Sequence, residues 1–243
     1  MFPSHTRVGA PWSRGTWTRA TALREHLTQM TDRPTRAPVP GSKAVTSPLY
    51  RPDWKYVPGV PMEDLRRADW DLLESQRPTF YEENQVDAIL KMFDTMREEP
   101  TFGYRVNNYQ HCMQAATRSY LDGRDEEDTV VCLLHDIGFV VAPSRHGAFA
   151  SELLGPYVSE RNRWMLQRHQ VFGDHHVVEF PRLFDPEGRE RWRGHEFFDW
   201  GAEFAEKYDQ GAIDPKFESA PLDLFIPMVR RIFARPPRTI PIE

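Results

Sequence analysis

Residues 130–141 read VVCLLHDIGFVV, an apolar run that contains the polar pair His135 and Asp136. A carboxylate in such a run is costly to bury unless it is paired with a cation or bound to a metal ion. Imidazole and carboxylate together suit Zn, Fe, Mn or Co. Gly138 lets the chain turn sharply after the pair, so that both side chains can face one site. The run therefore predicts an apolar helix that ends at a polar, metal-binding pair.

The sequence around this run has the period of amphipathic helices, and no strand-like alternation is evident. Gly123 stops one helix, the acidic residues 125–128 suit the start of the next, and Ser159 is a plausible N-cap. Residues 173–194 are polar and contain Gly and Pro, so we expect a loop there. Helices are expected over residues 62–77, 82–97, 105–121, 125–138, 146–157, 160–170, 195–209 and 221–233. The sequence thus predicts an all-α fold.

Residues 1–60 differ in composition from the rest of the chain. They are rich in Pro and Arg, and no acidic residue precedes Glu25. We interpret them as a mobile tail. An organelle transit peptide has a similar composition, and an over-long gene start with Met30 as the true initiator is the simpler alternative. Residues 61–243 are then expected to form a single helical domain of ordinary size.

Composition narrows the class of partner. Lys plus Arg number 31 and Asp plus Glu number 36, a net charge of −5. This balance argues against a nucleic-acid binder, because phosphates call for a basic face. No apolar run approaches the length that crosses a bilayer, so no membrane association is expected. Cys112 and Cys132 are too few for a disulfide framework, which favours a reducing, cytoplasmic compartment. The expected partner is a small-molecule substrate.

Four histidines lie on or beside the expected helices: His111, His135, His146 and His169. A single buried histidine more often makes an ordinary hydrogen bond than a metal bond, so none of them decides the matter alone. The segments YQHCMQAA (109–116), LLHDIG (133–138) and KYD (207–209), together with the last two histidines, resemble the HD-domain superfamily of metal enzymes. The order H…HD…H…H…D most resembles the superfamily's mixed-valent diiron oxygenases, which include myo-inositol oxygenase and the oxygenase of 2-amino-1-hydroxyethylphosphonate.

This resemblance implies an HD-type helical bundle around a dinuclear metal site. Asp136 would bridge the two metals, because a shared carboxylate offsets the repulsion of two cations about 3.5–4 Å apart. The first metal would be held by His111, His135, Asp136 and Asp209, and the second by Asp136, His146 and His169. Asp209 matches the family's late aspartate because an aromatic residue precedes it. Asp185 and Asp199 are rival candidates that lack this setting.

Two enzyme classes fit such a site. Most HD proteins are phosphohydrolases, which would use Mn, Mg or Zn to activate water. Many of them carry Lys or His three residues after the HD aspartate, where this chain has Phe139. Phe139 and the YQHCMQAA segment favour the oxygenase reading, which implies an Fe(II)/Fe(III) pair and dioxygen as co-substrate. A non-catalytic ligand-binding HD module is the third alternative.

The substrate is less well defined, because the chain departs from the family at its substrate-binding positions. The reaction implied is cleavage of a C–P or C–C bond beside a hydroxyl-bearing carbon, and a phosphonate is the first guess by analogy. Phosphonate oxygenases have Tyr, Glu and Lys at the positions of Thr101, Tyr104 and Gly173, and the lysine of inositol oxygenase corresponds to Phe139.

Two residues are candidate substrate contacts in their place. Arg118 follows His111 by seven residues on the same helical face and could meet a phosphonate, although a surface arginine is the simpler interpretation. Tyr104 could cap the metal site or could be a core aromatic. His175 and His176 are expected in a solvated loop and could line the mouth of the site.

Overall fold

The computed structural model describes residues 54–57, 60–179 and 184–239. The described residues from Tyr56 onward belong to one compact unit. The mobile tail expected over residues 1–60 therefore lies almost entirely outside the described residues, as does Met30. Among the described residues, none of the helices is long and apolar enough to cross a membrane.

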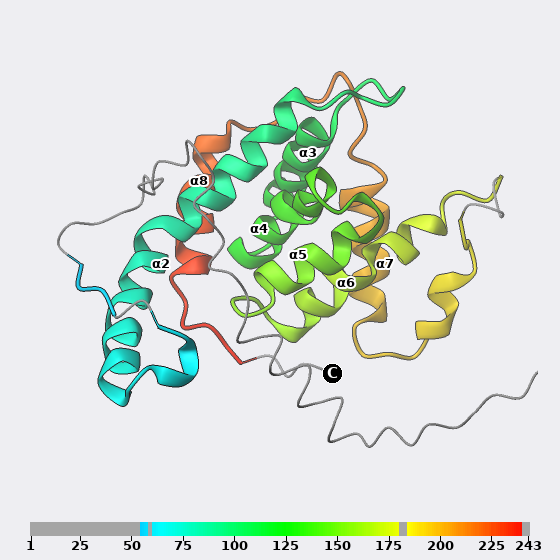
Figure 1. Ribbon diagram of the computed structural model, residues 1–243. Coiled ribbons are helices and arrows are strands. Elements are labelled where there is room, and N and C mark those ends of the chain that lie inside the picture. The colour runs from blue at the N-terminus through cyan, green and yellow to red at the C-terminus, as the bar shows by residue number, and fades with distance from the viewer. Residues whose placement is uncertain (1–53, 58–59, 180–183, 240–243) are drawn as a thin grey trace, which may run out of the picture. The chain divides into compact units, whose positions relative to one another are not determined.

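The described part of the chain is all-α, as the sequence predicts, and it contains no strand. Its main helices are α2 (Arg67–Thr95), α3 (Asn108–Leu121), α4 (Glu126–Leu134), α5 (His146–Leu154), α6 (Glu160–Asp174), α7 (Phe198–Phe204) and α8 (Leu222–Phe233) (Figure 1). Short 3₁₀ helices lie at Met62–Asp64, Met96–Glu98, Ile137–Val140, Pro143–Arg145 and Gly188–Trp192. A π-helical turn, Ala205–Asp209, continues α7.

Several expected helix boundaries are wrong: two helices begin three residues late, at Asn108 and Phe198, and two end elsewhere, at Leu154 and Asp174. The helices predicted over 62–77 and 82–97 are one helix, α2, with Pro78 inside it. Pro78 is exposed, so the carbonyl that loses its hydrogen bond can be hydrated and the helix continues. The helix expected to reach Gly138 ends at Leu134, and Asp136 leaves the helical conformation with φ −102° and ψ 9°. The expected loop over 173–194 also contains one turn of 3₁₀ helix.

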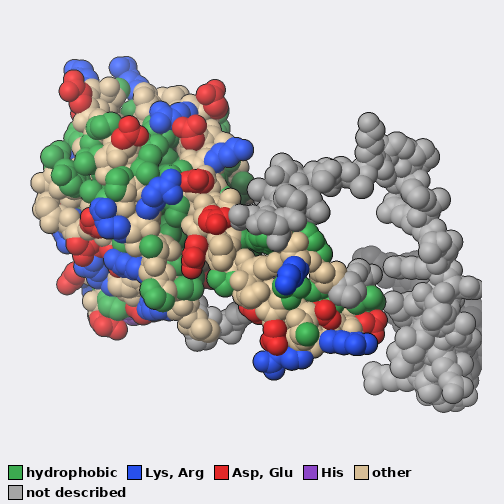
Figure 2. Space-filling view, turned by 90° about the vertical axis from the view of Figure 1, so that its left-hand side faces the viewer, with side chains coloured by type: hydrophobic (Ala, Val, Ile, Leu, Met, Phe, Trp, Pro, Cys, Tyr) green, Lys and Arg blue, Asp and Glu red, His purple; other side chains and the backbone are tan. Residues whose placement is uncertain are grey.

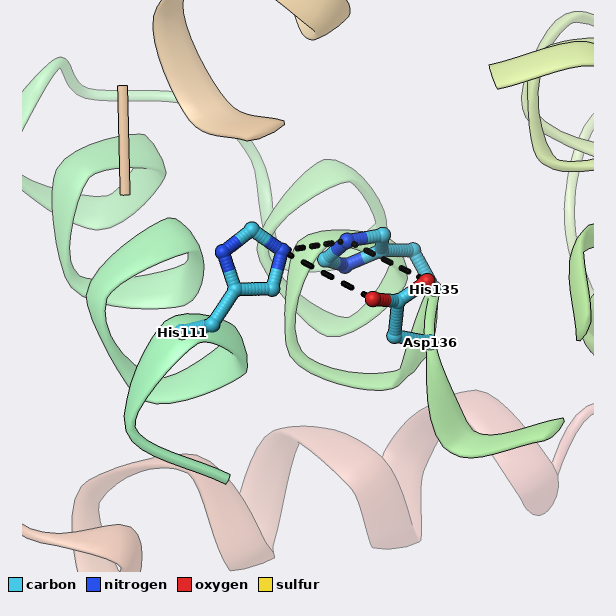
Figure 3. A group of neighbouring side chains, drawn as sticks. All are labelled: His111, His135 and Asp136. Carbon is cyan, nitrogen blue, oxygen red and sulfur yellow. Dashed lines mark hydrogen bonds and ion pairs between the residues drawn. The ribbon is translucent and has the colours of Figure 1, made fainter. Parts of the chain in front are cut away.

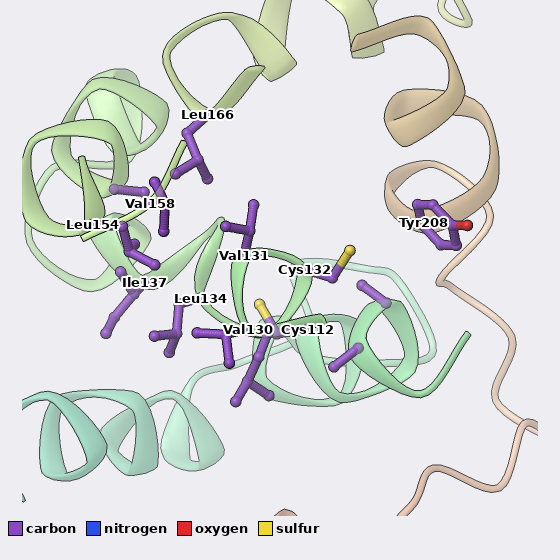
Figure 4. Packing of buried hydrophobic residues seen from close by; sticks show 14 of the residues in the cluster. Cys112, Val130, Val131, Cys132, Leu134, Ile137, Leu154, Val158, Leu166 and Tyr208 are labelled. Atoms are coloured by element: carbon purple, nitrogen blue, oxygen red, sulfur yellow. The ribbon is translucent and has the colours of Figure 1, made fainter. Parts of the chain in front are cut away.

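The core is built around α3 and α4, which pack against each other. On one side α5 pairs with α6, and on the other α8 contacts both α4 and α2 (Figure 1). Side chains of α4 such as Val130, Val131 and Leu134 are fully buried, as are the thiols of Cys112 and Cys132 (Figure 4). Each buried aliphatic side chain contributes roughly 1.5–3 kcal/mol to the stability of the fold, so this apolar layer holds the neighbouring polar site rigidly in place.

Helix caps fix where the functional residues fall. The Asn107 side chain accepts a hydrogen bond from the Gln110 backbone N–H at 3.0 Å, and the Gln110 side chain accepts one from the Asn107 N–H at 2.9 Å. This reciprocal cap starts α3 one turn before His111. The Ser159 side chain caps α6, as expected, by accepting from the Asn162 N–H.

Charged side chains are mixed on the surface. On the face shown in Figure 2, Lys and Arg alternate with Asp and Glu, and no large region of one sign is visible among the coloured residues. Many of these charges form ion pairs between helices, for example Arg230 of α8 with Asp87 of α2 at 2.7 Å. Exposed pairs of this kind contribute about 0–1 kcal/mol each.

Candidate metal centre

The structure brings together all six side chains that the resemblance singles out. His111 lies in the first turn of α3, and His135 and Asp136 follow the last residue of α4. His146 begins α5, His169 lies in the last turns of α6, and Asp209 ends the π-helical turn. The first five are buried and Asp209 is half-buried. Residues separated by up to 98 positions in the chain therefore converge on one polar site inside an apolar core.

The first group consists of His111, His135 and Asp209. The Nε2 atoms of His111 and His135 are 3.0 Å apart. Oδ1 of Asp209 lies 3.5 Å from the first of these nitrogens and 3.9 Å from the second. Figure 3 shows the two imidazoles approaching each other from α3 and from the end of α4, with Asp136 beside them. The three side chains surround one point.

The second group consists of His146 and His169, and Asp136 lies between this group and the first. The Nε2 atoms of the two histidines are again 3.0 Å apart. Oδ1 of Asp136 lies 3.1 Å from Nε2 of His146 and 3.3 Å from Nε2 of His169. Its other oxygen, Oδ2, lies 3.8 Å from Nε2 of His111. Oδ1 also lies 3.7 Å from Nε2 of His135, so the carboxylate stands between the two groups.

The backbone sets the tautomer of each imidazole. In every case Nδ1 faces a carbonyl oxygen: that of Ala212 for His111 (3.2 Å), Cys132 for His135 (2.8 Å), Pro143 for His146 (2.7 Å) and Leu166 for His169 (2.8 Å). A carbonyl only accepts hydrogen bonds, so Nδ1 carries the proton and donates it. Where both rings of a pair are neutral, their Nε2 lone pairs face each other across 3.0 Å, which is repulsive unless a metal ion or a proton lies between them.

This donor set fits metal ions. Nitrogen or oxygen ligands about 2.0–2.1 Å from a shared ion lie about 3–3.4 Å from each other, which is the spacing within each histidine pair. Nδ1–H donation to a backbone carbonyl is also the usual way in which a protein orients a metal-binding histidine. His111, His135 and Asp136 could hold one ion, and Asp136, His146 and His169 a second.

The electrostatics of the site favour a bound cation. Burial lowers the pKa of His135 to about 4, so this imidazole is neutral at pH 7. Burial alone would raise the pKa of Asp136, but the surrounding histidines, His135 first, hold it well below its usual value. Asp136 therefore stays ionised, and against the effect of burial it raises the pKa of His169, so that without a metal ion a proton on Nε2 of His169 is favoured. A neutral imidazole beside a carboxylate is the protonation state that metal binding requires.

A π-helical turn places Asp209. The Gln210 N–H donates to the Ala205 carbonyl at 3.0 Å, which adds one residue to the last turn of α7. The buried Tyr208 hydroxyl donates to Asp122 at 3.0 Å and accepts from Arg124 Nε at 3.1 Å, which anchors the turn to the end of α3. Such turns are frequent at functional sites. The sequence analysis expected an ordinary helix end here.

Gln114 is a supporting residue that the sequence analysis did not single out. Its buried amide donates to the Asp214 carbonyl at 2.8 Å and accepts from the Asp214 N–H at 3.2 Å. This two-bond contact holds the segment after the π-helical turn, so that the Ala212 carbonyl reaches His111. The only signal in the sequence was the position of Gln114 three residues after His111, on the same face of α3.

Gly138 is required for a different reason from the one expected. Its φ is not in the left-handed region, so a sharp turn does not explain it. A Cβ there would lie 2.8 Å from the His146 carbonyl oxygen. Gly138 thus allows the chain after Asp136 to approach the start of α5, and this close contact brings His146 to the carboxylate.

A cavity of about 430 Å³ opens onto the site. His111, Asp136 and Asp209 line its floor, and its walls include all four positions at which the chain departs from the family: Thr101, Tyr104, Phe139 and Gly173. Tyr104 is 65% exposed, so it is not a core aromatic. His176 also lines the cavity, whereas Nδ1 of His175 faces the Pro186 carbonyl.

Arg118, which the sequence analysis offers as a candidate substrate contact, does not line this cavity. Two helical turns separate it from His111, and its guanidinium lies over the Phe217 ring, 4.5 Å from the centroid. It lines a different surface hollow. The rival aspartates are also elsewhere, since Asp185 pairs with Arg191 at 3.1 Å and Asp199 is exposed. No family model and no curated protein matches this chain.

Proposed function

We propose that the chain is an HD-domain enzyme with a dinuclear metal site, and that it acts as a diiron oxygenase. The observation that carries the proposal is the set of four backbone-oriented histidines whose Nε2 atoms meet in two pairs, 3.0 Å apart within each pair, around the carboxylate of Asp136. His111, His135, Asp136 and Asp209 would hold one iron, and Asp136, His146 and His169 the other. The substrate is a small organic molecule with a hydroxyl beside the C–C or C–P bond that is cleaved.

When bound, an Fe(II)/Fe(III) pair supplies the activation of dioxygen, which accepts the electrons that the substrate loses. The chain supplies the geometry. The buried carboxylate of Asp136 would be shared by two cations, and Phe139, tilted against the His146 ring at 5.0 Å between centroids, forms an apolar wall beside His146. The cavity then positions the substrate over the floor and limits the access of water.

A metal-dependent phosphohydrolase is the second candidate, and one residue favours it. His176 lines the cavity, and burial lowers its pKa, so at pH 7 it is a neutral base that could exchange a proton with water or a leaving group. Against it, Phe139 lies where many HD hydrolases place a residue that acts on the substrate, and a phenyl ring cannot transfer a proton.

The test is iron content and an electron paramagnetic resonance spectrum after anaerobic purification and partial reduction. Two irons per chain with a coupled mixed-valent signal, and oxygen uptake with a suitable alcohol, are the expected result. Asp136→Asn should abolish the coupled signal, whereas the matched control Asp199→Asn at an exposed position should retain it. If the protein releases phosphate from phosphoesters with Mn or Mg and shows no coupled signal after iron reconstitution, the oxygenase proposal is wrong and the hydrolase proposal is supported.

A further inference from the structure

The walls of the cavity above the candidate metal centre define the chemistry of the molecule that it admits. Apart from the side chains of the floor, the described residues that line it are apolar, aromatic or neutral and polar, and His176 is the one histidine among them. No Lys or Arg is among them. An anionic group at the end of a substrate remote from the floor would therefore lose its hydration and find no cationic partner among these residues.

The rim is unusually apolar for exposed surface. Phe102, Tyr104 and Ile213 are 73%, 65% and 47% exposed, and all three line the cavity. Val177 and Phe139 continue the apolar surface inward. Exposed apolar side chains gathered around one opening, rather than scattered singly, are typical of a ligand-binding surface.

Phe102 is held in this rim at a conformational cost. It is the one non-glycine residue with positive φ, at 53°, among the described residues, and Gly103 follows with φ 105°. The Tyr104 N–H donates to the Thr101 carbonyl at 2.9 Å and closes this turn. A bulky side chain in the left-handed region is disfavoured, so the turn presents two aromatic rings at the cavity despite local strain.

One neutral polar group is free to bind a ligand. Asn108 lines the cavity, and its Nδ2 is buried without a hydrogen-bond partner. The neighbouring amide of Asn107 is already used in the cap of α3, and Gln210 donates to the Glu206 carbonyl. An unpaired amide donor suits a neutral oxygen such as a hydroxyl, which it can satisfy without introducing charge.

We infer that the cavity takes an uncharged hydroxylated molecule with an aromatic or comparably apolar body, and that it discriminates against molecules whose remote end is a phosphonate or another anion. The apolar body packs between the rings at the rim, and a hydroxyl approaches Asn108. This inference rests on the proposed function for the role of the floor, and it narrows the substrate class away from the phosphonates that the family resemblance suggests.

The test compares two probes that share a glycol and differ at the remote end: 3-phenyl-1,2-propanediol and 2,3-dihydroxypropylphosphonate. Both are titrated calorimetrically into the full-length, metal-loaded protein without oxygen. The phenyl compound should bind more tightly by about tenfold or more, from the apolar area that it buries. Equal or tighter binding of the phosphonate overturns the inference.

Variants at the rim separate charge from shape. Ile213→Lys places a cation at an exposed position, and it should shift the preference toward the phosphonate by about threefold or more, whereas Ile213→Gln should not. Phe102→Gly should weaken the binding of the phenyl compound without weakening the binding of the phosphonate. If neither variant changes the ratio of the two affinities, the walls do not select the ligand and the inference fails.

Oxygen uptake measured in parallel with iron-loaded protein keeps the two proposals apart. If oxygen uptake depends on iron but the protein prefers the phosphonate, the substrate inference is wrong and the oxygenase proposal still holds. If the protein prefers the phenyl compound but hydrolyses phosphoesters and shows no iron-dependent oxygen uptake, the oxygenase proposal is wrong. The inference about the selectivity of the cavity then still holds.

Discussion

Two glycines near the candidate metal centre differ in the space around them. A Cβ on Gly147 would lie 2.7 Å from the Leu166 carbonyl oxygen and 2.9 Å from Cε1 of His169, whereas a Cβ on Gly173 would meet only Asp209 Oδ2, at 3.7 Å. Gly147→Ala should lower the free energy of unfolding by about 1–3 kcal/mol, because α5 and α6 must separate. It should also halve the metal content, because it displaces His169. Unfolding in urea and metal analysis measure both effects.

Gly173→Ala is the matched control, because ordinary contact leaves room for the methyl group. It should leave the metal content unchanged and raise the free energy of unfolding by about 0.5 kcal/mol, since alanine restricts the unfolded chain. If both variants behaved alike, the close packing of Gly147 against His169 would not be what positions that ring.

Phe102 offers a second comparison at the scale of one residue. Its φ of 53° suits glycine, so Phe102→Gly should be more stable than Phe102→Ala by about 1 kcal/mol, the reverse of the order found in helices. Both variants should bind the phenyl probe with equally reduced affinity, because both lack the aromatic ring of Phe102. Thermal unfolding and calorimetry check this pair, and a Phe102→Ala protein as stable as Phe102→Gly would contradict the strain.

Residue types and order were enough to predict which side chains meet. His135 and Asp136 in an apolar run already indicated a buried polar site, and the resemblance named the four other members that the structure brings to it. What the sequence could not supply was the reason for each placement. The Nδ1 contacts, the Gln114 amide and the approach of Gly138 to His146 depend on which backbone atoms meet, and no local pattern encodes that.

At the scale of elements, Glu127 joins the start of α4 to the start of α6. It accepts hydrogen bonds from the Ser159 N–H at 2.7 Å and from Asn162 Nδ2 at 2.9 Å, and it pairs with Arg235. Partial burial alone would raise its pKa, but these bonds lower it to about 2. Its stabilising effect is therefore complete above the unfolded pKa, 4.5, and is lost as the pH falls toward 2.

Glu127→Gln should lower the free energy of unfolding at pH 7 by about 1–2 kcal/mol, a value reduced by solvent screening of the arginine pair. The difference from the wild-type protein should shrink between pH 4.5 and 2, the window set by the two pKa values. Urea unfolding at several pH values measures it. Glu126→Gln, at an exposed pair with Arg231, is the control and should have a smaller effect. A difference that stays constant down to pH 2 would contradict the lowered pKa.

Element boundaries were harder to predict than element types. The apolar period correctly indicated helix over most of α2, but the exposure of Pro78, which lets the helix continue, is a tertiary property. The π-helical turn at Ala205–Asp209 was missed for a similar reason. Its extra residue is stabilised by the contacts of Tyr208 with Asp122 and Arg124, which are more than 80 positions away in sequence.

At the scale of the whole molecule, the candidate metal centre couples nearly every layer of the fold. α3, α4, α5, α6 and the turn after α7 each contribute to it, so the helices that pack the core are also those that position the polar site. Without a metal ion, the Nε2 atoms of His111 and His135, and those of His146 and His169, lie 3.0 Å apart with only a proton available to bridge each pair. Metal binding should therefore stabilise the folded molecule as a whole.

Ligand linkage gives the size of that effect. Metal at a hundred times its dissociation constant stabilises a one-site protein by about 2.7 kcal/mol, which in a chain of this length raises the melting temperature by about 5–10 °C. Removing metal with a chelator should lower the melting temperature by that amount, and adding Fe(II) or Zn(II) without oxygen should restore it. Asp136→Asn should melt at the same temperature with and without metal, whereas Asp199→Asn should keep the full shift. If neither chelator nor added metal changes the melting temperature of the wild-type protein, the converging histidines hold no ion. An ion that binds only the folded state must raise its melting temperature.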